Sequence, residues 1–244
     1  ENKVEYFVSY YDYYQPEAYV PSKDLYIEKD SSINDEIDEL RHAATAAIID
    51  RRDTIIVSSV SCIYSIGEKE EYIKKMLNLY VGQTIERDRI LEKLVSMQYE
   101  RNELDLKRGT FRAKGDTIEL IPIGEKKDGI RIEMFDDEIE KLSHFDPLTG
   151  RTTSNVKTIN VFPASLFVTS DEKMIEATKR IEEELKGRLV ELKNDGKLLE
   201  EQRLRERTMY DLEMLKETGF CHGIENYSRH LSLRDAGETP TTLI

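Results

Sequence analysis

The hydrophobic period of the chain changes abruptly at Gly109, and this change limits the folds that the sequence can adopt. Before it, apolar residues recur every three to four positions over 32–51, 68–80 and 86–99, as in amphipathic helices. After it, short segments of 109–168 alternate with period two between Gly-Asp, Asp-Gly and Pro-Leu-Thr-Gly turns, as in an antiparallel meander. We therefore predict an α/β protein that contains a domain with an antiparallel sheet.

The run Thr54–Val60 predicts a strand of a different kind. It is apolar and β-branched, which is typical of a strand buried on both faces of a parallel sheet. It follows the helix predicted over 32–51, for which Ser32 is the expected N-cap. The order of helix, buried strand and helix indicates an α/β unit.

The helical period returns after the meander. Apolar residues line one side of Ser170–Asp195, and a second helix is expected from about Lys197 to Thr218. Ser170 is the expected N-cap of the first helix, and Gly219 suits the end of the second. These two segments predict a helical hairpin.

Tyrosines are concentrated near the start of the chain, in 4–29. This stretch is rich in aromatic and β-branched residues, and Pro16 and Pro21 cannot donate to a strand ladder, so they fit edges and turns. We predict a long hairpin. Aromatic residues occupy both of its faces, so the strands are either sandwiched in a core or exposed to stack against other flat rings. The residues alone leave both interpretations open.

The composition limits the possible functions. A net charge of −13 argues against DNA binding through a basic surface, so such a role would need aromatic stacking, local basic patches or basic surfaces from elsewhere. Cys62 and Cys221 lack C-x-x-C spacing, which favours a reducing cytoplasm. No apolar run approaches the length of about 18 residues that spans a bilayer. The chain has no phosphate loop and no initiator methionine, and we expect it to be part of a longer protein.

Basic residues gather around the predicted meander. Arg112 and Lys114 lie two apart in one strand and therefore share a face, as do Arg131 and Glu133. Such a patch could bind phosphate or an acidic partner protein, or it could be a solvated sheet face. The basic residues are Arg101, Lys107, Arg108, Arg112, Lys114 and Arg131.

Two further stretches give weaker indications. Cys221, His222 and His230 lack standard zinc spacing, so no metal site is predicted. The dense, non-periodic segment 219–234 is expected to be a functional loop or a contact between domains, and its residues do not define a chemistry.

Five long motifs connect the chain with a known family. They are VEYFVSYYDYYQPEAYVP, IVSSVSCIY, RGTFRAKGDTIELIP, VFPASLFVT and RTMYDLEMLKETGFCHGIENYSRHL. Together they resemble, from end to end, the UvrB family of damage-verifying subunits in bacterial nucleotide excision repair. The alternative is the interaction module of a transcription-repair coupling factor, which shares the RGTFR-like strand and has no DNA-probing role. The intact tyrosine segment favours the UvrB family.

The resemblance implies a partial RecA-like helicase core with an inserted α+β domain, a protruding β-hairpin and a helical region. The implied domains are 1–34, the tyrosine hairpin (part of helical domain 1b); 35–74, part of RecA-like domain 1a; 75–168, the inserted UvrA-interaction domain; and 169–244, helical domain 1b.

The resemblance also implies a function, which is recognition and verification of damaged DNA, with binding to UvrA before handover to UvrC. The family's lesion-probing tyrosines fall on Tyr10, Tyr11, Tyr13, Tyr14, Tyr19 and Tyr26. Its UvrA-binding residues fall on Arg101, Arg112, Lys114, Arg131 and Glu133, and its hairpin-anchoring residues fall on Glu17, Lys29 and Glu225. The family commonly has arginine where this chain has Lys114, which keeps the charge but loses the planar fork.

Full-length members of the family bind ATP and Mg²⁺. The phosphate loop and the acidic Walker B-type motif are not found in this chain, so we expect no catalytic residue and no cofactor here, and no ATP hydrolysis or unwinding by this segment alone. Incision in the family belongs to UvrC.

Overall fold

The computed structural model describes most of the chain, and between residues 11 and 33 it defines the backbone of the strands but not their side chains. The described residues are 2–9, 11–15, 18–20, 25–27, 30–63, 67–125 and 128–243. This described part of the chain divides into two compact units, each with its own core. The first unit draws its residues from 1–64, 76–164 and 243–244, and the second from 65–75 and 165–242.

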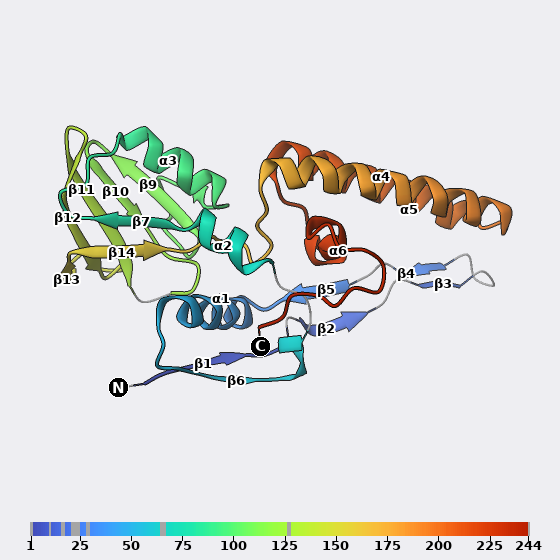
Figure 1. The fold of residues 1–244 in the computed structure, drawn as a ribbon, viewed down its shortest axis with the longest axis horizontal. Helices are drawn as coiled ribbons and strands as arrows, with labels where there is room; N and C mark the ends of the chain where they lie inside the picture. The colour runs from blue at the N-terminus through green and yellow to red at the C-terminus, as the bar shows by residue number, and fades with distance from the viewer. Residues whose placement is uncertain are drawn as a thin grey trace. The chain divides into compact units, whose positions relative to one another are not determined.

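A parallel pair of strands and one helix form the N-terminal part of the first unit. Strand β1 (Lys3–Phe7) pairs in parallel with β6 (Thr54–Ser58), helix α1 (Asp35–Asp50) packs against them, and a short 3₁₀ helix, η2 (Val60–Ile63), follows (Figure 1). The parallel pairing of the apolar run is confirmed, but the predicted burial on both faces is wrong. Ile55 is 50% exposed because, in the described chain, β6 has one neighbouring strand and one covering helix.

Helix α1 begins later than its hydrophobic period predicts. Its N-cap is Asn34, whose side-chain oxygen accepts a hydrogen bond of 2.9 Å from the backbone N–H of Glu36. Ser32, the predicted N-cap, lies instead in strand β5 (Asp30–Ile33), so that prediction is wrong. Pairing of β5 with β2 (Tyr11–Gln15) fixes these residues as a strand and overrides the local helical pattern.

The tyrosine-rich segment contains two antiparallel strand pairs. β2 pairs with β5, and β3 (Ala18–Val20) pairs with β4 (Leu25–Ile27). The second pair is nested within the first along the chain. This order of pairing is that of a long hairpin.

The predicted antiparallel meander is confirmed for residues 110–156, which lie in the largest sheet of the described chain, but its last predicted segment, 157–168, is not part of that sheet. The strand order of the sheet is β13-β12-β11-β10-β9-β8, with only the short β8 parallel to its neighbour. Helix α3 (Arg87–Ser96) supplies Ile90 and Leu94 to the core on one face of this sheet (Figure 1). The strands are β8 (Glu100–Arg101), β9 (Thr110–Lys114), β10 (Thr117–Leu120), β11 (Gly129–Phe135), β12 (Glu138–Phe145) and β13 (Thr152–Val156).

The helix predicted over 68–80 is only partly correct. Helix α2 (Lys69–Lys75) ends early, and β7 (Leu77–Tyr80) follows, paired antiparallel with β14 (Thr158–Val161). Burial alternates along β7, and Leu79 is fully buried in the core of the sheet domain. The last turn of the expected helix is therefore a four-residue strand. Its residues alternate between buried and exposed, and the distant strand β14 pairs with it.

The second unit is built on a helical hairpin. Helices α4 (Asp171–Asn194) and α5 (Leu198–Thr218) lie side by side, as predicted (Figure 1). Ser170 caps α4 by accepting a hydrogen bond from the backbone N–H of Lys173, and Gly219 ends α5 with a φ of 72°. Both terminal residues were predicted from the sequence. The short elements η3 (Ile224–Tyr227) and α6 (Ser228–Leu231) pack beside the hairpin.

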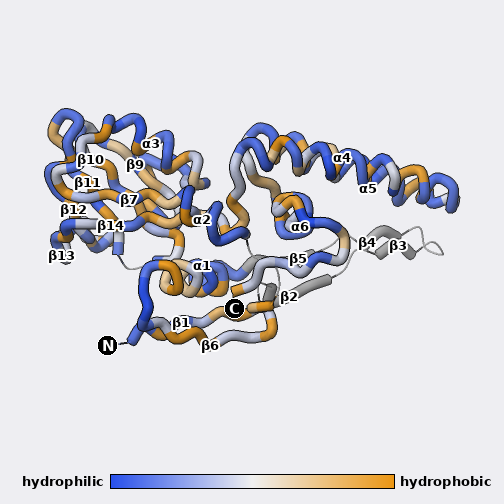
Figure 2. The backbone as a smooth tube through the Cα atoms, viewed as in Figure 1, coloured by the Kyte–Doolittle hydropathy of each residue, from blue (hydrophilic) through white to orange (hydrophobic). Residues whose placement is uncertain are grey.

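Hydropathy differs between the parts of the fold. A hydrophobic segment marks β6, whereas polar and apolar positions alternate along the strands of the large sheet and along α4 and α5 (Figure 2). In the described part of the chain, no helix combines the length and the apolar character that crossing a membrane requires.

The helical hairpin offers a matched pair of glycines. Gly219→Ala should lower the free energy of unfolding by about 1 kcal/mol, because a Cβ is strained in the left-handed region. Gly187→Ala should raise it by about 0.5–1 kcal/mol, because the position is helical and a Cβ there meets nothing within 4 Å. Urea denaturation followed by circular dichroism measures both changes. Two changes of the same sign would contradict this account of the two positions, one at a helix end and one in a helix interior.

Candidate protein and nucleic-acid interfaces

The large sheet carries a charged face opposite its core. Ile118 and Leu120 point into the core, so Glu119 between them points to the other face. The register of the strands places Arg112 of β9 and Arg131 of β11 on either side of Glu119. Three neighbouring strands therefore bring three charged side chains into one row.

Glu119 joins the two arginines directly. Arg112 donates from Nε to Oε2 at 2.7 Å, with Nη2 at 2.6 Å from the same oxygen. Arg131 donates from Nε to Oε1 at 2.7 Å, with Nη2 also at 2.6 Å. Burial raises the pKa of Glu119, but hydrogen bonds from both guanidinium groups outweigh that effect and lower it. The carboxylate is therefore charged and shared between two cations.

Arg131 has further contacts that fix its position. Its Nη2 donates to the backbone oxygen of Gly150 at 3.0 Å, and its guanidinium lies 4.7 Å from the ring centroid of Phe145. Phe145 fits there because residue 129 is glycine, and a Cβ at Gly129 would lie 2.4 Å from the ring. The sequence-based prediction included Arg131 but missed Glu119, Phe145 and Gly129, on which its geometry depends.

A second row lies beside the first. Lys114, Thr117 and Glu133 are opposite one another in register, and Glu133 forms an ion pair of 2.9 Å with Lys141. Lys114 is exposed. The structure therefore brings four of the five predicted UvrA-binding residues onto one face of the sheet. They are Arg112, Lys114, Arg131 and Glu133.

Arg101 lies apart from these rows. It is in β8 at the edge of the sheet, and its Nε donates to Glu103 at 2.8 Å. Its side chain is 54% exposed. Its register partner is Phe111, a core residue, so the register does not place Arg101 on the charged face with the other four.

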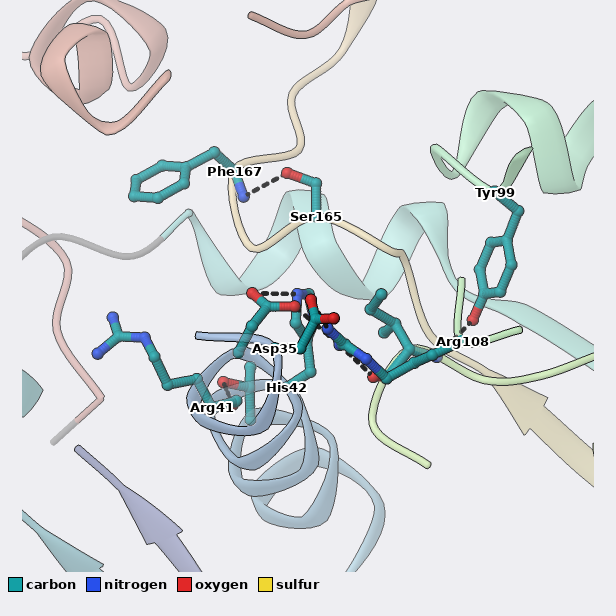
Figure 3. Close-up of polar contacts among 10 residues, drawn as sticks. Asp35, Arg41, His42, Tyr99, Arg108, Ser165 and Phe167 are labelled. Atoms are coloured by element: carbon teal, nitrogen blue, oxygen red, sulfur yellow. Dashed lines mark hydrogen bonds and ion pairs between the residues drawn. The ribbon is translucent and has the colours of Figure 1, made fainter. Parts of the chain in front are cut away.

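Arg108 belongs to a different set of contacts, with the first turn of α1. Its Nη1 donates to Asp38 at 2.7 Å and to the backbone oxygen of Ile123 at 2.8 Å, and its Nη2 lies 3.5 Å from Asp35 (Figure 3). The hydroxyl of Tyr99 accepts a bond of 3.3 Å from the N–H of Ile123. Arg108 thus joins the first turn of α1 to the sheet domain, and is not a member of the exposed basic patch.

His42 lies one turn further along α1, where it is almost completely buried. Its Nε2 is 3.7 Å from Asp38. Burial lowers the pKa of His42 to about 4, and the nearby cations Arg108 and Arg41 lower it while Asp38 raises it. The imidazole is therefore neutral at pH 7. Arg41 itself donates to the backbone oxygen of Val8 at 2.7 Å (Figure 3 shows its place on the helix).

The predicted lesion-probing tyrosines are placed only by their backbone. Tyr11, Tyr13 and Tyr14 lie in β2, and Tyr19 of β3 is opposite Tyr26 of β4. Their side chains are not described, so the choice between a core and a stacking role stays a prediction. Tyr10 lies outside the described residues.

The predicted anchors of the hairpin are likewise only partly described. Glu17 and Lys29 lie outside the described residues, and Glu225 is in η3 of the second unit. Their mutual contacts stay a prediction.

Cys221 is buried, and this burial raises the pKa of its thiol to about 12, so it is not a nucleophile at pH 7. Within the described ranges, no group of three or more His, Cys, Asp or Glu side chains could hold a metal ion.

Comparison with known proteins matches a part of each unit to a family. Residues 77–167 match the family described as the UvrB interaction domain, and residues 172–233 match the UvrB third helical domain. The chain is 59% identical over 244 residues to UvrABC system protein B of Dehalococcoides mccartyi. It is 58% identical over 243 residues to UvrABC system protein B of Geobacillus kaustophilus, and 59% over 244 residues to that of Clostridium acetobutylicum. Each comparison covers all of this chain and 37% of the relative, so the chain spans little more than a third of the relatives' length.

The buried His42 makes stability depend on pH. Its folded pKa of about 4 lies below the ordinary value of 6.5, so the unfolded chain takes up the proton first as pH falls. This contribution to stability is complete above pH 6.5 and is lost towards pH 4, by about 3 kcal/mol in all. Urea unfolding of the wild type and of His42→Gln at pH 4, 5, 6 and 7 should show a shallower pH slope in the variant.

His222→Gln is the control for this measurement, because His222 is exposed. Carboxylates titrate in the same range in all three proteins, so the slope is read as a difference from the wild type. Equal slopes for the wild type and His42→Gln would contradict the neutral, buried state of His42.

Proposed function

Because the chain belongs to the UvrB family through its interaction domain and its third helical domain, we propose that it acts in bacterial nucleotide excision repair. Its role there is to recognise and verify damaged DNA in the cytoplasm, between binding to UvrA and handover to UvrC. The observation that carries the proposal is the charged face of the sheet, which lies in the segment that matches the interaction domain.

UvrA is the proposed partner of this charged face. Arg112 and Lys114 present cations on a sheet whose other face is the core of the domain. An arginine held by a neighbouring carboxylate is suited to meet a second carboxylate, and charges arranged in this way give specificity and fast association. The proposed partner surface on UvrA is therefore acidic.

Damaged DNA is the proposed partner of the tyrosine hairpin. A net charge of −13 disfavours broad contact with phosphates, whereas ring stacking contributes about 1–3 kcal/mol per base and tolerates any sequence. The nested antiparallel pairs β2–β5 and β3–β4 give the tyrosines an extended ribbon. Such a ribbon can lie along separated bases.

The parallel pair β1–β6 is proposed to be part of a RecA-like helicase core. Parallel sheets are normally covered on both faces, and here Val4, Tyr6, Ile55 and Val57 are each 50% exposed. This apolar surface supports burial by other segments of the longer protein. The family implies ATP and Mg²⁺; within the described residues no group of three or more His, Cys, Asp or Glu side chains could hold a metal ion, and no catalytic step is assigned to this chain.

Lys114→Glu in the full-length protein tests the UvrA-binding face. The side chain is exposed, so folding should be unchanged, and UvrA association should weaken by about tenfold or more through charge repulsion. Binding to UvrA from the same organism is measured by surface plasmon resonance. Lys186→Glu on α4, where the lysine is also exposed, is the matched control. Wild-type affinity of Lys114→Glu would remove UvrA from this face.

Tyr13→Ala combined with Tyr14→Ala tests the stacking role of the hairpin. Loss of even one stacked base should weaken binding of the full-length protein to damaged DNA by about tenfold. The corresponding phenylalanine variants keep the rings and should bind like the wild type. Fluorescence anisotropy measures binding, and thermal unfolding checks the fold. Unchanged DNA binding by the alanine variants would exclude stacking, and a collapse in stability would favour a core strand.

A further inference from the structure

We propose that Glu119 is a positioning residue of the partner-binding face, which orients Arg112 so that the outer edge of its guanidinium meets a carboxylate of the partner. This inference rests on the proposed function, in which UvrA binds that face. It assigns different tasks to Arg112 and Arg131, which the resemblance places together, and adds Glu119: Arg112 makes the contact, and Glu119 and Arg131 hold it in place.

The two arginines beside Glu119 are not equivalent. Arg131 donates to Glu119, to the backbone oxygen of Gly150 at 3.0 Å and to the hydroxyl of Thr152 at 3.4 Å, and it covers Phe145. Its side chain is 19% exposed. Most of its donors and one face of its guanidinium are therefore used inside the domain, and Arg131 acts as a support.

Arg112 keeps donors for a partner. In the described part of the chain its bonds go to Glu119 alone, from Nε and Nη2 to one carboxylate oxygen. A guanidinium has five N–H groups, so the edge that carries Nη1 stays available for a second carboxylate. The exposed Lys114 follows two residues later on the same strand and face, where it adds a second cation for the same acidic partner.

Glu119 has two opposite effects on the attraction of the face for an acidic partner. Its negative charge offsets one of the two neighbouring arginines and so reduces the long-range attraction. Its hydrogen bonds fix the side chain of Arg112 before binding and so remove part of the ordering cost of the complex. Removal of the charge alone would speed association, whereas loss of orientation would speed dissociation.

The test measures association and dissociation rates of the full-length protein with UvrA from the same organism. Glu119→Gln keeps the shape of the side chain but cannot accept from both arginines, because its amide nitrogen is a donor. We expect dissociation to become about tenfold faster, as for loss of a charge-assisted hydrogen bond, and association to be unchanged or faster. Glu183→Gln on α4 removes the same charge at an exposed position and should alter neither rate.

Glu119→Asp is the second variant. It keeps the charge but is shorter by one methylene, so one carboxylate can no longer reach both arginines, and dissociation should again accelerate. A dissociation rate is read only from folded, bound molecules, so a lower folded fraction reduces the binding amplitude and leaves this rate unchanged. Wild-type dissociation rates in both variants would overturn the positioning role.

Lys114→Glu separates this inference from the proposed function on which it rests. If Lys114→Glu weakens binding while both Glu119 variants dissociate like the wild type, the face binds UvrA and only the role of Glu119 is wrong. If Lys114→Glu binds like the wild type, the assignment of UvrA to this face is wrong, and the proposed role of Glu119 in UvrA binding is wrong as well.

Discussion

The ion pair between Arg108 and Asp38 is the contact on which the arrangement of the first unit depends. It binds the first turn of α1 to the sheet domain, in which Arg108 also donates to the backbone oxygen of Ile123 and the N–H of Ile123 donates to the hydroxyl of Tyr99. Close packing here requires glycine, because a Cβ at Gly124 would lie 3.0 Å from the backbone nitrogen of Ala43. Helix α1 and the domain that carries the charged face are thus joined near the start of the helix by this partly buried cation, and at the end of the helix by Asn160, whose side-chain N–H donates to Asp50 at 2.6 Å.

Much of the fold could be predicted because local patterns specify it. The change of period at Gly109 identifies the meander, and Ser170 and Gly219 mark the ends of helices through capping rules that act within one turn. The errors occur where distant pairing decides. Leu77–Tyr80 joins β14, about eighty residues later in the chain, and no local signal reports such a partner.

The sequence contains a signal for one contact of the charged face, the pairing of Arg112 with Glu119. Gly115 and Asp116 form a two-residue turn between β9 and β10, and residues equally distant from such a turn lie opposite one another. Arg112 and Glu119 are equally distant from it, so their pairing was readable. The residue that lies opposite Arg131 could not be predicted in this way, because the connection between β10 and β11 is longer and its turn geometry does not fix the register. The orientation of the tyrosines depends on tertiary surroundings that a strand pattern alone does not define.

The shared carboxylate of Glu119 also separates two properties of the face by their response to ionic strength. Salt screens exposed charges over distances of about 8–10 Å, so the attraction that Lys114 exerts on an approaching partner weakens as salt rises. The bonds between Glu119 and its arginines are short and only 11% of the Glu119 side chain is exposed, so screening reaches them far less. At high salt the arrangement of Glu119 and its arginines is therefore preserved, although the long-range attraction of the face for an acidic partner is weaker.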